Sequence, residues 1–264
     1  MSPSRPATRV RRLFVLLCGF EILPKTISTR GRGGRFILSE PVCAYLLDTA
    51  GGWVLLDAGL SPDNGRDPVR RERKFWSQGM TAPVIRDGHL LEGQLAAIGV
   101  GVKDINQVIL SHLHYDHAGC LRQFTHAQIS VQRREYEHAF SADPGIAYFR
   151  EEYDDPRLQW QLREGDWEVM PGLEWIDTRG HTQGHQSALV ELPETGTMVL
   201  PFDAGDLEEN FEEEIAPGET CDEAAALRAI RRLKGIEAER DATRLLFHDP
   251  VAIQKMRLAP ECYR

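Results

Sequence analysis

The segment Ser111-His-Leu-His-Tyr-Asp-His-Ala-Gly119 concentrates metal-binding side chains directly after an apolar run. Its pattern is H-x-H-x-D-H, formed by His112, His114, Asp116 and His117. Side chains at i and i+2 of an extended segment point to the same side, so His112 and His114 can share one ion. Asp116 and His117 offer an oxygen and a nitrogen to a second ion nearby. Imidazole and carboxylate without thiolate favour zinc, with iron, manganese or cobalt as alternatives.

Further candidate ligands stand at the ends of other predicted strands. His181 lies in Thr178-Arg-Gly-His-Thr-Gln-Gly-His185, where two glycines permit tight backbone geometry. Asp203 and His248 each follow an apolar run. Each residue alone would more often cap a helix or satisfy a core contact. Their common position at strand ends, in the number that two coordination spheres need, makes them candidate ligands.

Short apolar runs alternate with helical patterns, which is typical of an α/β fold. Strands are predicted at 13–20, 42–48, 53–57, 107–110, 129–131, 173–176, 187–190, 197–200 and 244–247, and helices at 90–98, 133–140 and 223–234. For the last helix we predict an N-cap at Asp222 and a stop at Gly235. Residues 61–90 show no sustained period and predict a surface excursion that serves as a lid or binding wall. Without a repeat or linker, 1–264 is predicted to be one domain.

Composition and charge narrow the class of protein. The chain has 264 residues and a formal net charge of −9, which disfavours nucleic acid as a partner. Its five cysteines are spread out and form no CxxC pair, so we expect a reducing compartment and a cytoplasmic location. The run 13–20 imitates a secretory signal but ends at Glu21, so it predicts a buried strand. No run approaches the roughly 18 apolar residues that span a membrane.

Together these motifs resemble the metallo-β-lactamase-fold hydrolases, and most closely the branch of N-acyl homoserine lactone lactonases. The resemblance rests on Pro41-Val-Cys-Ala-Tyr-Leu-Leu47, Val54-Leu-Leu-Asp-Ala-Gly59, 111–119, Val131-Gln-Arg-Arg-Glu-Tyr136, Glu164-Gly-Asp-Trp-Glu-Val169, Gly180-His-Thr-Gln-Gly-His-Gln-Ser187, 203–212 and Phe247-His-Asp249. The metal motif is specific to the superfamily. The Glu-Asn-Phe-Glu and Val-Gln-Arg-x-Glu-Tyr stretches indicate the lactonase branch.

The resemblance implies an αββα sandwich, with two mixed sheets face to face and helices outside. It implies two Zn²⁺ ions, although Co, Mn or Fe would also suit the ligands. The implied ligands are His112, His114 and His181 for one ion, Asp116, His117 and His248 for the other, and Asp203 as the bridge. Asp57 and His185 would support the ligands from behind.

The implied activity is that of a dinuclear zinc hydrolase, a lactonase, acting on a small-molecule lactone. A metal-bridging hydroxide would attack the ring of an N-acyl homoserine lactone, with Asp116, Asp203 and Asp206 in the catalytic set. A γ-butyrolactone, a pyridoxal-derived lactone, a thioester or a phosphotriester is the alternative substrate. An iron redox protein and a binding protein without catalysis are further alternatives. The protein would be a monomer or homodimer, without a membrane or nucleic-acid partner.

Three features depart from the lactonase pattern. Asp206 stands where the branch usually has a substrate-contacting tyrosine, and Cys120 replaces a common glycine. Residues 61–90 do not align. Asp206 could move a proton through water, or it could be a solvated residue at the pocket mouth, and it can donate a hydrogen bond only when protonated. Candidates for the wall of an acyl-chain pocket are Trp76, Tyr148, Phe149, Tyr153 and Trp160.

Overall fold

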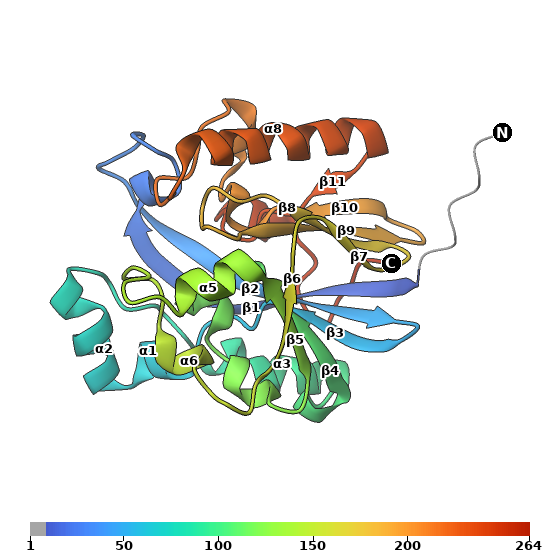
Figure 1. The fold of residues 1–264 in the computed structure, drawn as a ribbon, viewed down its shortest axis with the longest axis horizontal. Coiled ribbons are helices and arrows are strands. Elements are labelled where there is room, and N and C mark those ends of the chain that lie inside the picture. Colours follow the sequence, from blue (N-terminus) through green and yellow to red (C-terminus); the bar gives the residue numbers. More distant parts are fainter. Residues whose placement is uncertain (1–8) are drawn as a thin grey trace.

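The computed structural model describes residues 9–264, whose strands form two sheets packed face to face (Figure 1). The six-stranded sheet contains, in order, β1 (Val10–Pro24), β2 (Ile37–Thr49), β3 (Gly52–Leu56), β4 (Ile105–Ile109), β5 (Gln128–Gln132) and β6 (Gln159–Arg163). The five-stranded sheet contains β11 (Thr243–Arg244), β10 (Gly196–Leu200), β9 (Gln186–Leu192), β8 (Leu173–Asp177) and β7 (Trp167–Met170). Both sheets mix parallel and antiparallel pairs. The predicted sandwich is confirmed.

Helices cover the outer faces of the two sheets (Figure 1). The α-helices are α1 (Pro62–Arg66), α2 (Pro68–Lys74), α3 (Leu91–Ile98), α4 (Tyr115–Ala118), α5 (Arg133–Ala139), α6 (Arg150–Tyr153), α7 (Glu208–Glu212) and α8 (Glu223–Arg240). The long helix α8 lies across the outer face of the five-stranded sheet. No helix within 9–264 is long and apolar enough to cross a membrane.

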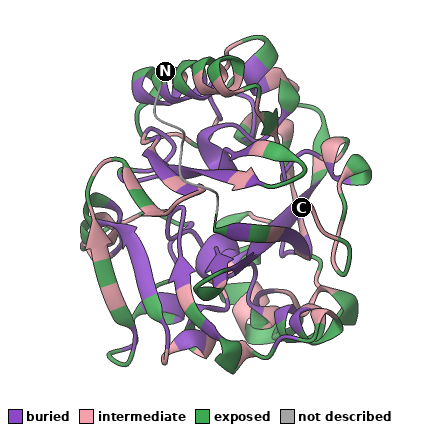
Figure 2. Cartoon of the chain, turned by 90° about the vertical axis from the view of Figure 1, so that its right-hand side faces the viewer, coloured by how far each residue is buried: buried purple, intermediate pink, exposed green. Residues whose placement is uncertain are grey.

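The packing of strand β2 explains why its sequence is almost continuously apolar. Successive side chains of a strand point to opposite faces. Tyr45 and Leu47 pack between the two sheets, whereas Ala44 and Leu46 pack toward the outer helices. Both faces of β2 are therefore buried. Figure 2 shows the same division, with buried residues on the strands and exposed residues along the outer side of the helices.

The predicted ends of the last helix and of the last strand need correction. Helix α8 continues through Gly235 to Arg240 and ends at Asp241, whose φ of 50° is left-handed. A glycine inside a helix costs only about 1 kcal/mol, and Ile236, one residue beyond it, packs against the apolar cluster under α8. The last strand, β11, covers only Thr243–Arg244, although Leu245, Leu246 and Phe247 are buried.

The segment 61–90, predicted as a surface excursion without a sustained period, contains two short α-helices. It forms α1 and α2, and the carboxylate of Asp67 caps α2 by accepting hydrogen bonds from the backbone N–H groups of Val69 and Arg70. Aspartate before a proline at the first helical position is a helix-start signal. These helices are too short to show a hydrophobic period. The run 13–20 is part of the buried strand β1, as predicted.

Candidate metal centre

All seven predicted ligands are buried and meet at one edge of the sandwich. Strand β4 delivers the segment 111–119, and β8 is followed by the loop that carries His181. Asp203 lies in the short turn Phe202–Ala204 after β10. His248 follows residues 245–247, which come directly after β11. None of these ligand candidates is more than 6% exposed. The structure therefore brings together residues that are up to 136 positions apart in the sequence.

The candidate ligands fall into two compact groups. The three-histidine group contains His112, His114 and His181, and the second group contains Asp116, His117, Asp203 and His248. Within each group the ligand atoms lie within 4.8 Å of one another. In the first, His181 Nε2 is 3.2 Å from His114 Nδ1. In the second, His117 Nε2 is 2.9 Å from Asp116 Oδ2.

Asp203 lies between the two groups. Its Oδ1 is 3.1 Å from His117 Nε2 and 3.4 Å from His248 Nε2. Its Oδ2 is 3.4 Å from His181 Nε2 and 3.8 Å from His112 Nε2. One carboxylate oxygen thus faces each group. The preceding Phe202 has a φ of 50°, which is unusual for a bulky residue and aims Asp203 into this position.

The chemistry of these residues fits a divalent metal ion. His112 Nε2, His117 Nε2 and Asp203 Oδ1 are buried without a hydrogen-bond partner among the described residues. Burial lowers the pKa of His112 and His114 well below the usual value, so both imidazoles are neutral and have free lone pairs. Burial opposes charge on Asp203, but His117 and His248 hold its pKa well below the usual range. The neutral imidazoles of His112 and His114 beside the ionised carboxylate of Asp203 supply nitrogen and oxygen donors that suit zinc.

Neighbouring acceptors orient the imidazole rings. His181 Nδ1 donates to the Glu219 carbonyl at 2.7 Å, and His248 Nδ1 donates to the Pro41 carbonyl at 2.9 Å. Each bond places the proton on Nδ1 and leaves Nε2 free to ligate. His117 Nδ1 lies 2.7 Å from Asp57 Oδ2. Partners of this kind fix the tautomer and the direction of a ligand.

Asp57 also holds the metal motif. It follows β3 with a φ of 58°, and its side chain accepts hydrogen bonds from Ser111 N at 2.7 Å and Ser111 Oγ at 2.8 Å.

Asp57→Asn should lower metal affinity or activity by about 10- to 100-fold, because the amide turns a donor toward groups that need an acceptor. Chelator competition and kcat/KM measure this effect. Asp48→Asn, at a carboxylate paired with Arg11 and Arg12, is the control. Equal metal affinity in both variants would contradict the role.

His185 lies beside the second ligand loop in the supporting position that the resemblance implies. Its Nε2 accepts a hydrogen bond from Asp203 N at 3.1 Å. Its Nδ1 lies 3.2 Å from the Thr178 carbonyl, to which it donates. Burial lowers its pKa to about 3, so the ring is neutral. Since both ring nitrogens have partners, His185 positions Asp203 and is poorly placed to ligate.

Asp206 is buried rather than solvated. It is 7% exposed, and its Oδ1 has no hydrogen-bond partner among the described residues. Burial, reinforced by the charge of Asp203, raises its pKa well above the usual value. The interpretation of Asp206 as a solvated residue at the pocket mouth is therefore wrong.

Two further buried acids near His248 were not predicted. Glu21 and Glu40 are cross-strand partners in β1 and β2. Tyr115 Oη donates to Glu21, and Ser28 Oγ donates to Glu40 at 2.5 Å. Burial raises the pKa of Glu40 to about 7. A charged residue inside an apolar strand is the signal that could have identified them.

The predicted aromatic wall is mostly wrong. Tyr148 does lie at the site, with its ring centroid 4.6 Å from that of His114. Tyr153 and Phe149 are core residues at 0% and 1% exposure, and Trp76 is 49% exposed. Trp160, the remaining candidate, lies in β6 and packs against the core of the six-stranded sheet. Cys120 is buried and donates to the Leu60 carbonyl, as expected of a packing residue.

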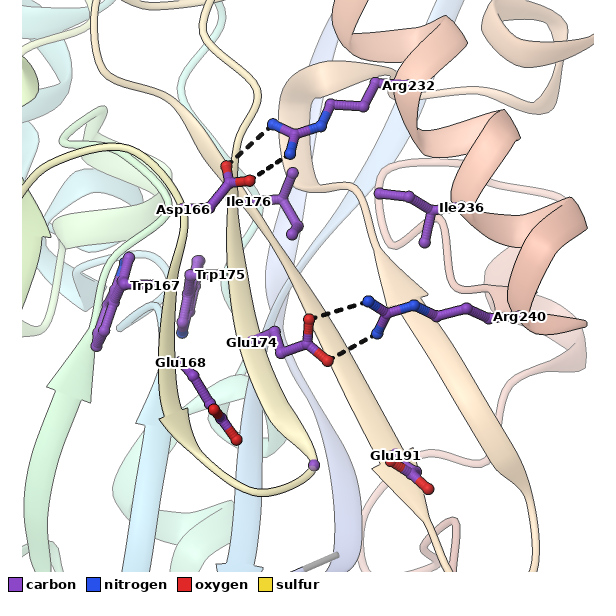
Figure 3. A pocket seen from close by; sticks show the side chains of 11 residues that line it. Asp166, Trp167, Glu168, Glu174, Trp175, Ile176, Glu191, Arg232, Ile236 and Arg240 are labelled. Carbon is purple, nitrogen blue, oxygen red and sulfur yellow. Dashed lines mark hydrogen bonds and ion pairs between the residues drawn. The ribbon is translucent and has the colours of Figure 1, made fainter. Parts of the chain in front are cut away.

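One sizeable cavity lies away from the histidines. It has a volume of about 590 Å³ and runs between α8 and the strands β7 and β8 (Figure 3). Its arginines are paired, Arg232 with Asp166 and Arg240 with Glu174. A smaller cavity of about 190 Å³ adjoins the metal site and is lined by His114, Tyr148 and His181. This smaller cavity reaches the candidate ligands His114 and His181.

Comparison with known proteins identifies the class of protein. A family model described as the metallo-beta-lactamase superfamily matches residues 40–240. The chain belongs to this superfamily. Within it, the chain is 35% identical over 232 residues to N-acyl homoserine lactonase AiiA of Bacillus thuringiensis subsp. kurstaki, covering 85% of this chain and 88% of that protein. It is 34% identical over 233 residues to N-acyl homoserine lactonase AttM of Rhizobium radiobacter, covering 84% and 87%.

Solved structures agree with this placement. The fold matches that of a quorum-quenching N-acyl homoserine lactone lactonase with a TM-score of 0.85 and 31% identity, over 97% of this chain and 99% of that chain. A second match, with a TM-score of 0.86 and 31% identity, covers 97% and 100%. It is an N-acyl homoserine lactone hydrolase with the product N-hexanoyl-L-homoserine bound at the catalytic metal center. The predicted family is confirmed.

Proposed function

We propose that the protein hydrolyses the lactone ring of N-acyl homoserine lactones. The observation that carries the proposal is the placement of Asp203, with one oxygen toward each group of buried ligand atoms. The similarity to curated N-acyl homoserine lactonases over about 85% of the chain supports this substrate class.

The three-histidine group would hold one ion, the second group would hold the other, and Asp203 would contact both. Zinc suits these ligands best, and cobalt, manganese or iron would also fit. Two divalent ions held there would lower the pKa of water enough to supply a nucleophile at neutral pH and would polarise the lactone carbonyl.

The chain's own residues would position the reaction. Asp203 sets the separation of the two groups. Tyr148 and the small cavity beside His114 and His181 would receive part of the substrate. The helices of 61–90 would form a wall beside the metal motif, because Phe75 after α2 packs against Tyr115 with ring centroids 5.3 Å apart.

The cysteines Cys18, Cys43, Cys120, Cys221 and Cys262 are free thiols, which agrees with the proposed cytoplasmic location.

Asp206 would replace the tyrosine of the lactonase branch as a hydrogen-bond donor. It lies three residues after Asp203, is buried, and has an unpartnered oxygen. A carboxyl group whose pKa is raised keeps its proton to a higher pH, and while protonated it can donate a hydrogen bond. A protonated Asp206 could therefore contact an oxygen of the substrate in the way a hydroxyl would.

Two variants test whether Asp206 acts as a protonated hydrogen-bond donor or as an anion. Asp206→Asn keeps an N–H donor and should retain kcat/KM within about fivefold. Asp206→Ala removes it and should lose about 10- to 100-fold, as expected for a hydrogen bond to a group that develops charge. Activity of the wild type should fall as pH rises through the raised pKa of Asp206, and Asp206→Asn should lack this fall. An Asn variant as inactive as the Ala variant would show that Asp206 acts as an anion.

The substrate itself is tested by following proton release. Opening a lactone produces a carboxylic acid, so a weakly buffered solution of the zinc-loaded protein should acidify with N-acyl homoserine lactones. Several acyl-chain lengths should be compared with a γ-butyrolactone, a pyridoxal-derived lactone, a thioester and a phosphotriester. Flat traces for all acyl homoserine lactones, beside turnover of another ester, would overturn the substrate but leave the metal centre standing.

A further inference from the structure

Glu135 is a fully buried carboxylate that accepts four hydrogen bonds. It lies in the first turn of α5 and is 0% exposed. Oε1 accepts from Leu113 N at 3.0 Å and from Tyr148 Oη at 2.8 Å. Oε2 accepts from Thr182 Oγ1 at 2.7 Å and from Gly184 N at 3.1 Å. Two bonds to each oxygen fill the acceptor capacity of an ionised carboxylate.

Three of these donors, Leu113 N, Thr182 Oγ1 and Gly184 N, belong to the segments that carry the three-histidine group. Leu113 lies between His112 and His114, and Thr182 directly follows His181. Tyr148, the remaining side-chain donor, packs edge-on against the His114 ring at 4.6 Å. Glu135 itself belongs to neither group of ligand atoms. It therefore joins the two ligand segments through hydrogen bonds and offers no ligand atom to either group.

The local packing holds the two ligand segments closely against Glu135. Gly184 lies so close to α5 that a Cβ there would be 2.4 Å from Glu135 N. The loop that follows His181 is thus held directly against the backbone of α5. A buried charge is tolerated only where hydrogen bonds compensate it, and here four donors converge. Glutamine has the same shape, but its NH₂ group would face two of these donors and leave them unpaired.

We propose that Glu135 is a positioning residue that sets the distance between the His112–His114 segment and His181, and thereby the affinity of the three-histidine group for a divalent ion. This inference rests on the proposed metal centre. It concerns one half of that centre, because in the other half His117 and His248 are oriented by Asp57 and by the Pro41 carbonyl.

The test is a zinc titration of the full chain against a chromophoric chelator, which resolves the binding constants of the two ions. Glu135→Gln should weaken one binding constant by about 10- to 100-fold and change the other much less. Glu152→Gln is the matched control, because Glu152 is another buried glutamate, 3% exposed, bonded to Asn64 and Arg70. The control should bind zinc like the wild type.

The outcomes separate positioning from a merely structural role. Zinc binding equal to the wild type, together with a lower unfolding temperature of the metal-free variant, would overturn the proposal. If Glu135→Gln does not fold, Thr182→Val removes one of the four bonds and should weaken the same constant about three- to tenfold. Unchanged affinity in that variant would also overturn the proposal. A wild type that binds zinc but opens no lactone would overturn the proposed function alone, whereas a wild type that binds no zinc would overturn both.

Discussion

Asp203→Asn should reduce kcat/KM for the lactone by about 10³-fold, at the upper end of what the loss of one preorganised electrostatic group costs. The reason is geometric, because Asp203 is the residue whose two oxygens face different ligand groups. The asparagine amide can offer an oxygen to one group only, and its NH₂ group would point a donor at the other. The charge that offsets the buried cations is lost as well.

Kinetics and metal analysis together measure this effect. The variant should contain less metal per chain after gel filtration than the wild type, and supplying excess zinc should restore only a small part of the activity. Asp48→Asn removes a buried carboxylate from β2, away from the ligand groups, and should leave both quantities unchanged. Full activity and full metal content in Asp203→Asn would show that the two groups do not share this carboxylate.

Removal of metal with a chelator should abolish hydrolysis and destabilise the fold. The metal-free centre leaves Asp57, Asp116 and Asp203 buried around His117. These charges, of which Asp116 has the largest influence, raise the pKa of His117 well above its usual value although burial opposes this. An ion present at 100 times its Kd stabilises the folded state by about 2.7 kcal/mol. For a chain of this size the unfolding temperature should therefore fall by about 5–10 °C for each ion that is removed.

Dialysis against a chelator, followed by addition of zinc, tests this prediction. Both activity and the unfolding temperature should return, and cobalt or manganese should restore them to different extents. Asp203→Asn should show a smaller temperature shift, because it has less metal to lose. Undiminished hydrolysis in the chelated protein would exclude a metal-dependent mechanism and favour a nucleophile from the chain itself.

Much of the candidate site could be predicted because its chemistry is local in the sequence. The spacing of His112, His114, Asp116 and His117 specifies imidazole and carboxylate donors on a short segment. Apolar runs before Asp57 and Asp203 predicted that both stand at strand ends, where the structure places them. The strands predicted at 42–48 and 53–57 are also present, and they pair as the antiparallel strands β2 and β3.

Other features could not be predicted because they depend on packing between distant segments. The end of α8 is decided by apolar contacts that outweigh the low helix propensity of Gly235. The helices in 61–90 are too short for a hydrophobic period to appear. The sequence left open whether Asp206 is solvated or acts at the site, and only the fold shows that it is buried.

Residue types and short spacings in the sequence indicated the donor atoms of the segment 111–119 and the family. The tertiary structure decided which oxygen of Asp203 faces which group and which acceptors orient the imidazoles. It also decided that Glu135 joins the segments of His112, His114 and His181. A hydrogen bond requires two groups within about 3 Å. Only the packed sheets and helices bring residues so far apart in the chain to that distance.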